Sequence, residues 1–288
     1  MGRVGVVGPG ALRGTRMAVT ADLQDAHRRV LAAAGDRLVE PLPAFGRTEA
    51  SGGWTALLSD EAEAAPVVLP GRGDGNVAFA GYGSRAAKMR IRCSGSRNVV
   101  FVGAHARVGG DFTIRGDDTL VYIGAFTTVS NITVSQRGGG MFFIGDHGML
   151  SARIFAGNSD EHSIYDLATG ERINPDRDTF IDDHVWIARD VRVAKGARIG
   201  RDTLVGQGSF VSGRLDSNCV YAGVPARKLR EGTTWSRTDE RSLAEMETSA
   251  RHKAFLAQLQ DLRARIASFA APAAAPPASR LAAEEAAV

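Results

Sequence analysis

The sequence predicts a mainly β protein whose central part is a parallel β-helix. Segments that begin at Phe101, Tyr122 and Phe143 recur every 21 residues, and each opens with an aromatic residue, a β-branched residue and glycine. Further along the chain, aliphatic residues recur at every sixth position. A period of six would scatter these side chains around a helix axis, whereas it suits short strands joined by tight turns. The six positions are Ile181, Ile187, Val193, Ile199, Val205 and Val211.

Three steps of six residues make a coil of about 18 residues, and each aliphatic side chain points into a core that stacks on the next coil. A coil of 21 residues then carries a bulged corner. Stacked coils satisfy each other's backbone hydrogen bonds, so the core can be long without being wide. We expect residues 76–235 to form this domain, interrupted by a loop at 157–179.

The flanking segments carry helix signals. Residues 20–34 are expected to form a helix with Thr20 as its N-cap and Gly35 just past its end, within an N-terminal accessory region, 1–75. A capping box at Ser242 opens a C-terminal α-helix within 236–270. Its apolar stripe would pack on the prism or on copies of itself. The stripe is Leu256, Leu259, Leu262, Ile266 and Phe269, and the Ala/Pro-rich residues 271–288 are expected to be disordered.

Composition limits the function classes. A net charge of +3 is too small to argue for nucleic-acid binding, and no apolar run is long enough to insert in a membrane. The glycine-rich start lacks the lysine of a phosphate-binding loop, because Ala11 follows Gly10. Only two cysteines, Cys93 and Cys219, occur, which suits a reducing compartment. We therefore expect a cytoplasmic protein.

The segment "IDDHVWIARDVRVAKGARIGRDTLVGQGSFVSGRLDSNCVYAGVPARKLR", residues 181–230, resembles the terminal coils of a known family. These are the left-handed β-helix hexapeptide-repeat acyltransferases, above all the O-acetyltransferases that act on galactosides, maltose and bacterial surface polysaccharides. The ending "VYAGVPARKLR" is a specific signature of that group. The resemblance covers about residues 99–235 and implies a left-handed helix, acetyl-CoA as donor, a saccharide acceptor and a homotrimer.

The polar loop "GNSDEHSIYDLATGERINP" carries the candidate general base. The resemblance implies that His162, which lies 24 residues before Trp186, is the catalytic histidine. Removing a proton from an attacking hydroxyl needs a base that titrates near neutral pH, and imidazole does so. Asp160, Glu161 or Asp166 could orient the ring, and the sequence does not choose among them. The alternative is a solvated loop histidine without a catalytic role.

The resemblance also implies donor contacts on the last coils. An indole would line the active-site end of a groove, two corner residues would flank the pantetheine arm, and arginines would meet phosphate oxygens. The alternative for the arginines is a charged solvent face. Where many relatives carry Thr-Lys, this chain has Ser-Gly, so one cationic contact is missing. The residues expected to bind the donor are Trp186, Arg189, Gln207, Ser212, Arg227 and Arg230.

The acceptor contacts are expected from Trp186 and from Asn131, which resembles an asparagine that holds a sugar hydroxyl in the family. The alternative for Asn131 is a corner residue in a left-handed turn. His105, His147 and His184 each fall three residues after a coil-start aliphatic, which predicts a column along one surface edge. Because no two histidines are five residues apart, the zinc-binding pattern of related β-helices is absent, and we expect no metal.

Two other functions compete with an O-acetyltransferase. An N-acyltransferase acting on an amino sugar nucleotide would use the same fold and donor. A non-catalytic β-helix scaffold would bind no CoA and would tolerate loss of His162.

Overall fold

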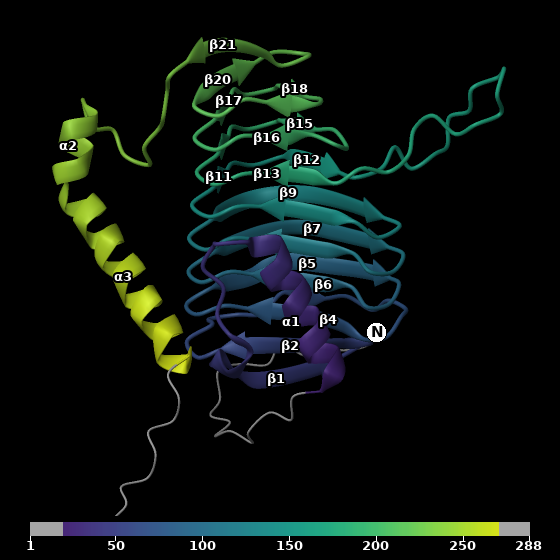
Figure 1. The fold of residues 1–288 in the computed structure, drawn as a ribbon, viewed down its shortest axis with the longest axis horizontal. Coiled ribbons are helices and arrows are strands. Elements are labelled where there is room, and N and C mark those ends of the chain that lie inside the picture. The colour runs from purple at the N-terminus through teal and green to yellow at the C-terminus, as the bar shows by residue number, and fades with distance from the viewer. Residues whose placement is uncertain (1–19, 271–288) are drawn as a thin grey trace, which may run out of the picture.

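The computed structural model describes residues 20–270, and its chain winds into a parallel β-helix (Figure 1). Strands of successive coils pair side by side and build flat faces. A short strand β1 (Phe45–Ser51) pairs antiparallel with β2 at the N-terminal edge of the first face. The first face consists of β2 (Trp54–Ser59), β4 (Asn76–Ala80), β6 (Val99–Val102), β8 (Leu120–Ile123), β10 (Met141–Ile144), β13 (Thr179–Ile181), β16 (Arg198–Ile199) and β19 (Arg214–Leu215).

The second and third faces merge in the early coils and separate in the late ones. There, β3 (Val67–Val68) pairs with the first of three long strands, β5 (Arg85–Ser94), β7 (Arg107–Arg115) and β9 (Thr128–Arg137). After β9 the second face continues through β11 (Met149–Leu150), β14 (Trp186–Ile187), β17 (Leu204–Val205) and β20 (Cys219–Ala222), which pairs antiparallel with β21 (Arg227–Glu231). The third face continues through β12 (Ile154–Gly157), β15 (Arg192–Val193) and β18 (Phe210–Val211).

The core is the stack of inward aliphatic side chains that the sequence predicts. Each of the six residues from Ile181 to Val211 in steps of six is at most 2% exposed and belongs to one continuous cluster. Register keeps the stack straight, because Ile144, Ile181, Ile199 and Leu215 are direct partners on successive coils. Burial of one such side chain stabilises the fold by roughly 1.5–3 kcal/mol.

Strand pairing continues across the predicted domain boundary at residue 76. β2 pairs in parallel with β4 from Trp54 to Leu58, so the sheet of the first face extends into the segment that we assigned to the accessory region. The division into domains stays a prediction. Residues 271–288, which we expect to be disordered, lie outside the described part of the chain.

An outward ladder of aromatic rings runs along the first face. The rings of Phe79, Phe101, Tyr122, Phe143 and Phe180 follow one another at centroid distances of 4.6–6.2 Å. Helix α1 (Ala21–Ala34) lies across this face and buries Leu23, Ala26 and Val30 against it (Figure 1). Thr20 accepts a hydrogen bond from the Leu23 amide and Gly35 follows the helix, as predicted. A 3-10 turn (η1, Leu42–Ala44) leads into β1.

The corner between the first and second faces carries the predicted histidine column. His105, Phe126 and His147 stack at 4.9 and 5.2 Å, and each has φ between 55° and 60°. The side chain of His184 stacks on Trp235 at 4.3 Å instead. The left-handed backbone costs about 1–2 kcal/mol per residue, so the packing of the rings offsets a local penalty.

The C-terminal segment covers this corner. It forms α2 (Leu243–Thr248) and α3 (Ala250–Ala270), and α3 lies along one side of the stack (Figure 1). Phe255 meets the rings of Phe126 and His147 edge-on at 5.4 and 4.8 Å. Burial therefore lowers the pKa of His147 to about 4. The predicted surface column is therefore present at this corner, but its histidines are half-buried because α3 and Trp235 partly cover them.

The face of α3 that packs on the prism contains Phe255 in place of the predicted Leu256. Leu262 is fully buried against Ala104 and Ala125, and Ile266 packs beside it. Leu256 is 41% exposed, whereas the preceding Phe255 reaches the histidine corner. Helix α3 thus packs on the prism. Within residues 20–270, no helix combines the length and apolar character needed to cross a bilayer.

Tight spacing at the corners leaves no room for side chains. A Cβ on Gly145 would lie 2.2 Å from Asp183 Oδ1 and 2.7 Å from its backbone nitrogen. We predict that Gly145→Ala lowers the free energy of unfolding by about 1–3 kcal/mol, because Asp183 must shift. Chemical denaturation would measure this. Gly46→Ala is the control, because its nearest contact would be an ordinary 3.5 Å. Equal effects of both substitutions would contradict the prediction.

A buried carboxylate makes stability depend on pH. Asp146 accepts a hydrogen bond from the Ala125 amide, and burial together with the neighbouring Asp183 raises its pKa to about 7. The folded state therefore favours the neutral acid more than the unfolded chain does. The stability that this group contributes is complete below about pH 4, where both states are protonated, and is lost as the pH rises to about 7.

We predict that Asp146→Asn removes this pH dependence. The difference in melting temperature between variant and wild type should shift in favour of the variant from about pH 5 to about pH 8. Thermal unfolding monitored by circular dichroism would show it, with the exposed Asp25→Asn as control. A constant difference across this range would refute the assignment.

Candidate active site

The loop that interrupts the repeat leaves the prism at the corner between the third and first faces. It departs after β12, returns at β13 and projects far from the stack (Figure 1). Its two arms run antiparallel, with the Ile173 amide donating to the Ile164 carbonyl at 2.9 Å. At the tip, Asp166 accepts from the amides of Ala168 and Thr169 and shapes the turn. These hydrogen bonds give the arm a defined structure of its own.

His162 lies near the base of this arm, where its backbone is held on both sides. Its amide donates to the Asp160 carbonyl at 2.8 Å, and its carbonyl accepts from Asn174 Nδ2 at 2.8 Å. Asn174 is buried and also accepts from the Ile164 amide. The imidazole itself is exposed. The fold therefore fixes the backbone of this residue and leaves its ring exposed.

Two further contacts anchor the base of the loop. Lys195 Nζ lies 2.6 Å from Asp160 Oδ2 and donates to the Asn174 carbonyl at 2.9 Å. The hydrogen bond from Lys195 lowers the pKa of Asp160. Glu161 accepts from Ser135 at 2.6 Å and from Arg115 at 3.0 Å, and its pKa is lowered, chiefly by the Ser135 hydroxyl.

None of the three candidate carboxylates is hydrogen-bonded to the His162 ring within residues 20–270. Asp160 faces Lys195, Glu161 faces Ser135 and Arg115, and Asp166 holds the tip of the loop. Each of the three has a partner that the sequence did not suggest.

Most of the residues expected to bind the donor lie on the second face, at its corner with the third face and on β21, and we call this region the donor edge. Trp186 lies on the second face between Met149 and Leu204. At the corner between the second and third faces, the Gly208 amide donates to the Arg189 carbonyl at 3.0 Å. Gln207 directly precedes Gly208, so the two predicted corner residues, Arg189 and Gln207, lie on adjacent coils. Arg227 and Arg230 are exposed on β21, which pairs with the end of the second face.

Ser212 and Asn131 lie elsewhere on the prism. Ser212 follows β18 at the corner between the third and first faces, away from the others. Asn131 lies within β9 and has no left-handed φ, so the alternative of a left-handed corner residue is wrong. Its amide donates to the Ser151 carbonyl on the next coil.

One chain alone does not bring His162 and the donor edge together. The loop leaves the prism at one corner, while Trp186 and Arg189 lie on the second face and at the corner beyond it. Trp186 meets Trp235, with ring centroids 5.8 Å apart. Within residues 20–270, no cluster of histidine, cysteine, aspartate or glutamate could hold a metal ion.

Sequence reasoning missed Asn174 and Lys195, which clamp the histidine. The Asn-Pro pair at 174–175 marks a turn but says nothing about a clamp. Lys195 is 35 residues beyond Asp160, and nothing in the local pattern links the two.

Comparisons with known proteins support the family suggested by the repeat. A polysialic acid O-acetyltransferase of Neisseria meningitidis is 32% identical over 126 residues, which are 43% of this chain and 58% of the relative. One from Escherichia coli O1:K1 is 31% identical over 100 residues, 35% of this chain and 33% of the relative. In three dimensions, the chain matches the polysialic acid O-acetyltransferase OatWY with a TM-score of 0.59 and 27% identity.

The chain is thus similar in sequence and in fold to O-acetyltransferases of polysialic acid. The structural match covers 65% of this chain and 92% of OatWY, which confirms the predicted fold class, a left-handed parallel β-helix with a C-terminal helix. The chain spans less than two thirds of the length of the two sequence relatives. No family model matches it.

The clamp generates a prediction about the loop. Asn174→Ala removes two hydrogen bonds to the loop backbone, one to Asp160 and one from Arg172. Each is worth about 0.5–1.5 kcal/mol. Amide hydrogen exchange in residues 160–175 should therefore accelerate at least tenfold while the core strands stay protected. Asn131→Ala is the control, because its side chain is exposed. Unchanged exchange in the loop would rule out the clamp.

Proposed function

We propose that the protein is an acetyl-CoA-dependent O-acetyltransferase that acylates a hydroxyl of a saccharide, with His162 as general base. The observation that carries the proposal is the loop, which departs from a regular prism and presents an exposed imidazole on a fixed backbone. A histidine can take the proton of the hydroxyl as its oxygen attacks the thioester carbonyl. The two sequence relatives are O-acetyltransferases of polysialic acid, which supports a polysaccharide or its precursor as acceptor.

The donor edge fits acetyl-CoA in its chemistry. Arg227 and Arg230 are exposed guanidinium groups at the end of the prism and suit phosphate oxygens. Trp186 is half-buried beside Trp235 and offers an aromatic wall near the acyl group. Arg189 and Gln207 lie on adjacent coils at the corner between the second and third faces. Ser212 lies at another corner, so it would reach a donor only from a neighbouring subunit.

We propose a homotrimer, because the two parts of the site lie on different edges of one prism. In a threefold ring, the loop of one subunit would reach the donor edge of the next, giving three identical sites. The loop carries apolar side chains that no described residue covers, such as Leu167 at 101% exposure and Tyr165 at 60%. Apolar groups gathered on a projecting arm mark an interaction surface.

We further propose the cytoplasm as the compartment. The proposed donor, acetyl-CoA, is a cytoplasmic metabolite. In addition, Cys93 and Cys219 are buried and unpaired. Free thiols of this kind suit a reducing environment.

The test is CoA release from acetyl-CoA with a panel of free sugars, sugar nucleotides and polysaccharide fragments. We predict that His162→Ala lowers the acceptor-dependent rate by about 10²- to 10⁴-fold, because a positioned base contributes that much. His252→Ala on α3 is the control, since it removes an imidazole far from the loop. Release that is insensitive to His162, or that needs no acceptor, would contradict the proposal. Release with amino sugar nucleotides alone would favour N-acylation, and absence of CoA binding would favour a scaffold.

A further inference from the structure

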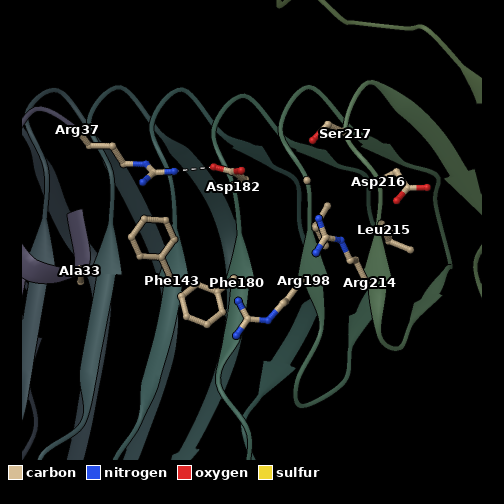
Figure 2. Close-up of a pocket in the computed structure, with 12 residues that line it drawn as sticks. Ala33, Arg37, Phe143, Phe180, Asp182, Arg198, Arg214, Leu215, Asp216 and Ser217 are labelled. Carbon is tan, nitrogen blue, oxygen red and sulfur yellow. Dashed lines mark hydrogen bonds and ion pairs between the residues drawn. The ribbon is translucent and has the colours of Figure 1, made fainter. Parts of the chain in front are cut away.

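The outward column on the first face changes character near its C-terminal end. Up to Phe180 it consists of stacked aromatic rings, and the next two positions in register are Arg198 and Arg214. The Arg198 guanidinium lies over the Phe180 ring, 4.3 Å from its centroid (Figure 2). The ring therefore positions the first arginine, and strand pairing places the second beside it.

Within the described part of the chain these last positions are open, because helix α1 ends before them. Its final turn reaches Ala33 and Ala34, and Arg37 then lies over the Phe143 ring and pairs with Asp182 at 2.6 Å (Figure 2). Beyond Arg37 the face forms a cavity of about 330 Å³. This volume is within the range of roughly 300–1,000 Å³ that small-molecule sites occupy.

Three arginines and two carboxylates line this cavity. Arg37 pairs with Asp182 and Asp183, and Lys228 pairs with Asp216 and Glu231. Arg198 and Arg214 form no ion pair with any residue in 20–270 and are exposed. Partners on neighbouring strands lie about 5 Å apart, and like charges at that position are destabilising. A bound anion would relieve the repulsion.

We propose that this cavity binds a carboxylate-bearing sugar residue of the acceptor, at a distance from the hydroxyl that reacts. The proposal rests on the proposed function, since it assigns part of the saccharide to this face. Guanidinium groups on two adjacent strands suit the carboxylates of an acidic sugar chain. The half-buried ring of Phe180 suits the C–H face of a sugar ring better than a free inorganic anion.

The cavity also lies beside the catalytic loop. Phe180 is the second residue of β13, the strand to which the loop returns, so the loop and the cavity share one coil. A chain of acidic sugars that occupies the cavity could extend around the corner toward the arm that carries His162. The cavity would then select acidic acceptors, whereas the loop would carry out the chemistry.

The experiment compares wild type with Arg198→Gln/Arg214→Gln in direct binding by calorimetry, without acetyl-CoA. The probes are fragments of polysialic acid and of polygalacturonic acid, and the same fragments with their carboxylates reduced to alcohols. We expect the double variant to bind the acidic fragments at least tenfold more weakly and the reduced fragments unchanged. Its affinity for acetyl-CoA should also be unchanged. Arg241→Gln/Arg263→Gln removes the same charge from exposed arginines elsewhere and should bind as wild type does.

Four results would overturn the proposal: no binding of either acidic probe by wild type, equal binding by both proteins, an equal loss for reduced fragments, or a loss of acetyl-CoA affinity in the double variant. The last would assign the arginines to the donor. Failure of the proposed function looks different. In that case no acceptor would support CoA release, although the double variant would still lose the acidic fragments selectively.

Discussion

The register between coils is the constraint on which the rest of the structure depends. Each inward aliphatic residue lies directly over its partner on the next coil, as Ile144, Ile181 and Ile199 do. An insertion is compatible with this stack only at a corner, where the chain can leave and return without shifting the strands on either side. The loop at 157–179 meets this condition, because β12 and β13 both keep their pairing with later coils. The core thereby fixes where an arm can project.

The outward surfaces depend on the same register in another way. Identical positions on successive coils form columns, so one aromatic residue per coil becomes a continuous ladder on the first face. Such a ladder must be covered, and α1 covers it over the early coils. The histidine corner is covered by α3 and Trp235. Among residues 20–270, no helix covers the late coils of the first face, and there the column changes from rings to guanidinium groups.

Features set by short-range pattern could be predicted from the sequence, and features set by packing could not. The inward residues from Ile181 to Val211 follow from a period that places each one in the core. The ends of α1 follow from Thr20 and Gly35. In contrast, the face of α3 that meets the prism depends on where Phe126 and His147 lie, which is why Phe255 and not Leu256 makes the contact. The clamp on His162 joins Asn174 and Lys195 across an irregular loop, beyond the reach of any periodicity.

The exposure of His162 on a single prism is the reason to propose that a second subunit completes the site. An exposed imidazole surrounded by water gains little from neighbouring charges, since high dielectric weakens every electrostatic interaction. Packing the arm against another prism would exclude water from His162 and would bury the apolar residues at the tip, such as Leu167. The clamp at Asn174 gains a function in this arrangement. It would hold the histidine in place before a proposed partner subunit binds, so that assembly would complete the site without having to order the loop first.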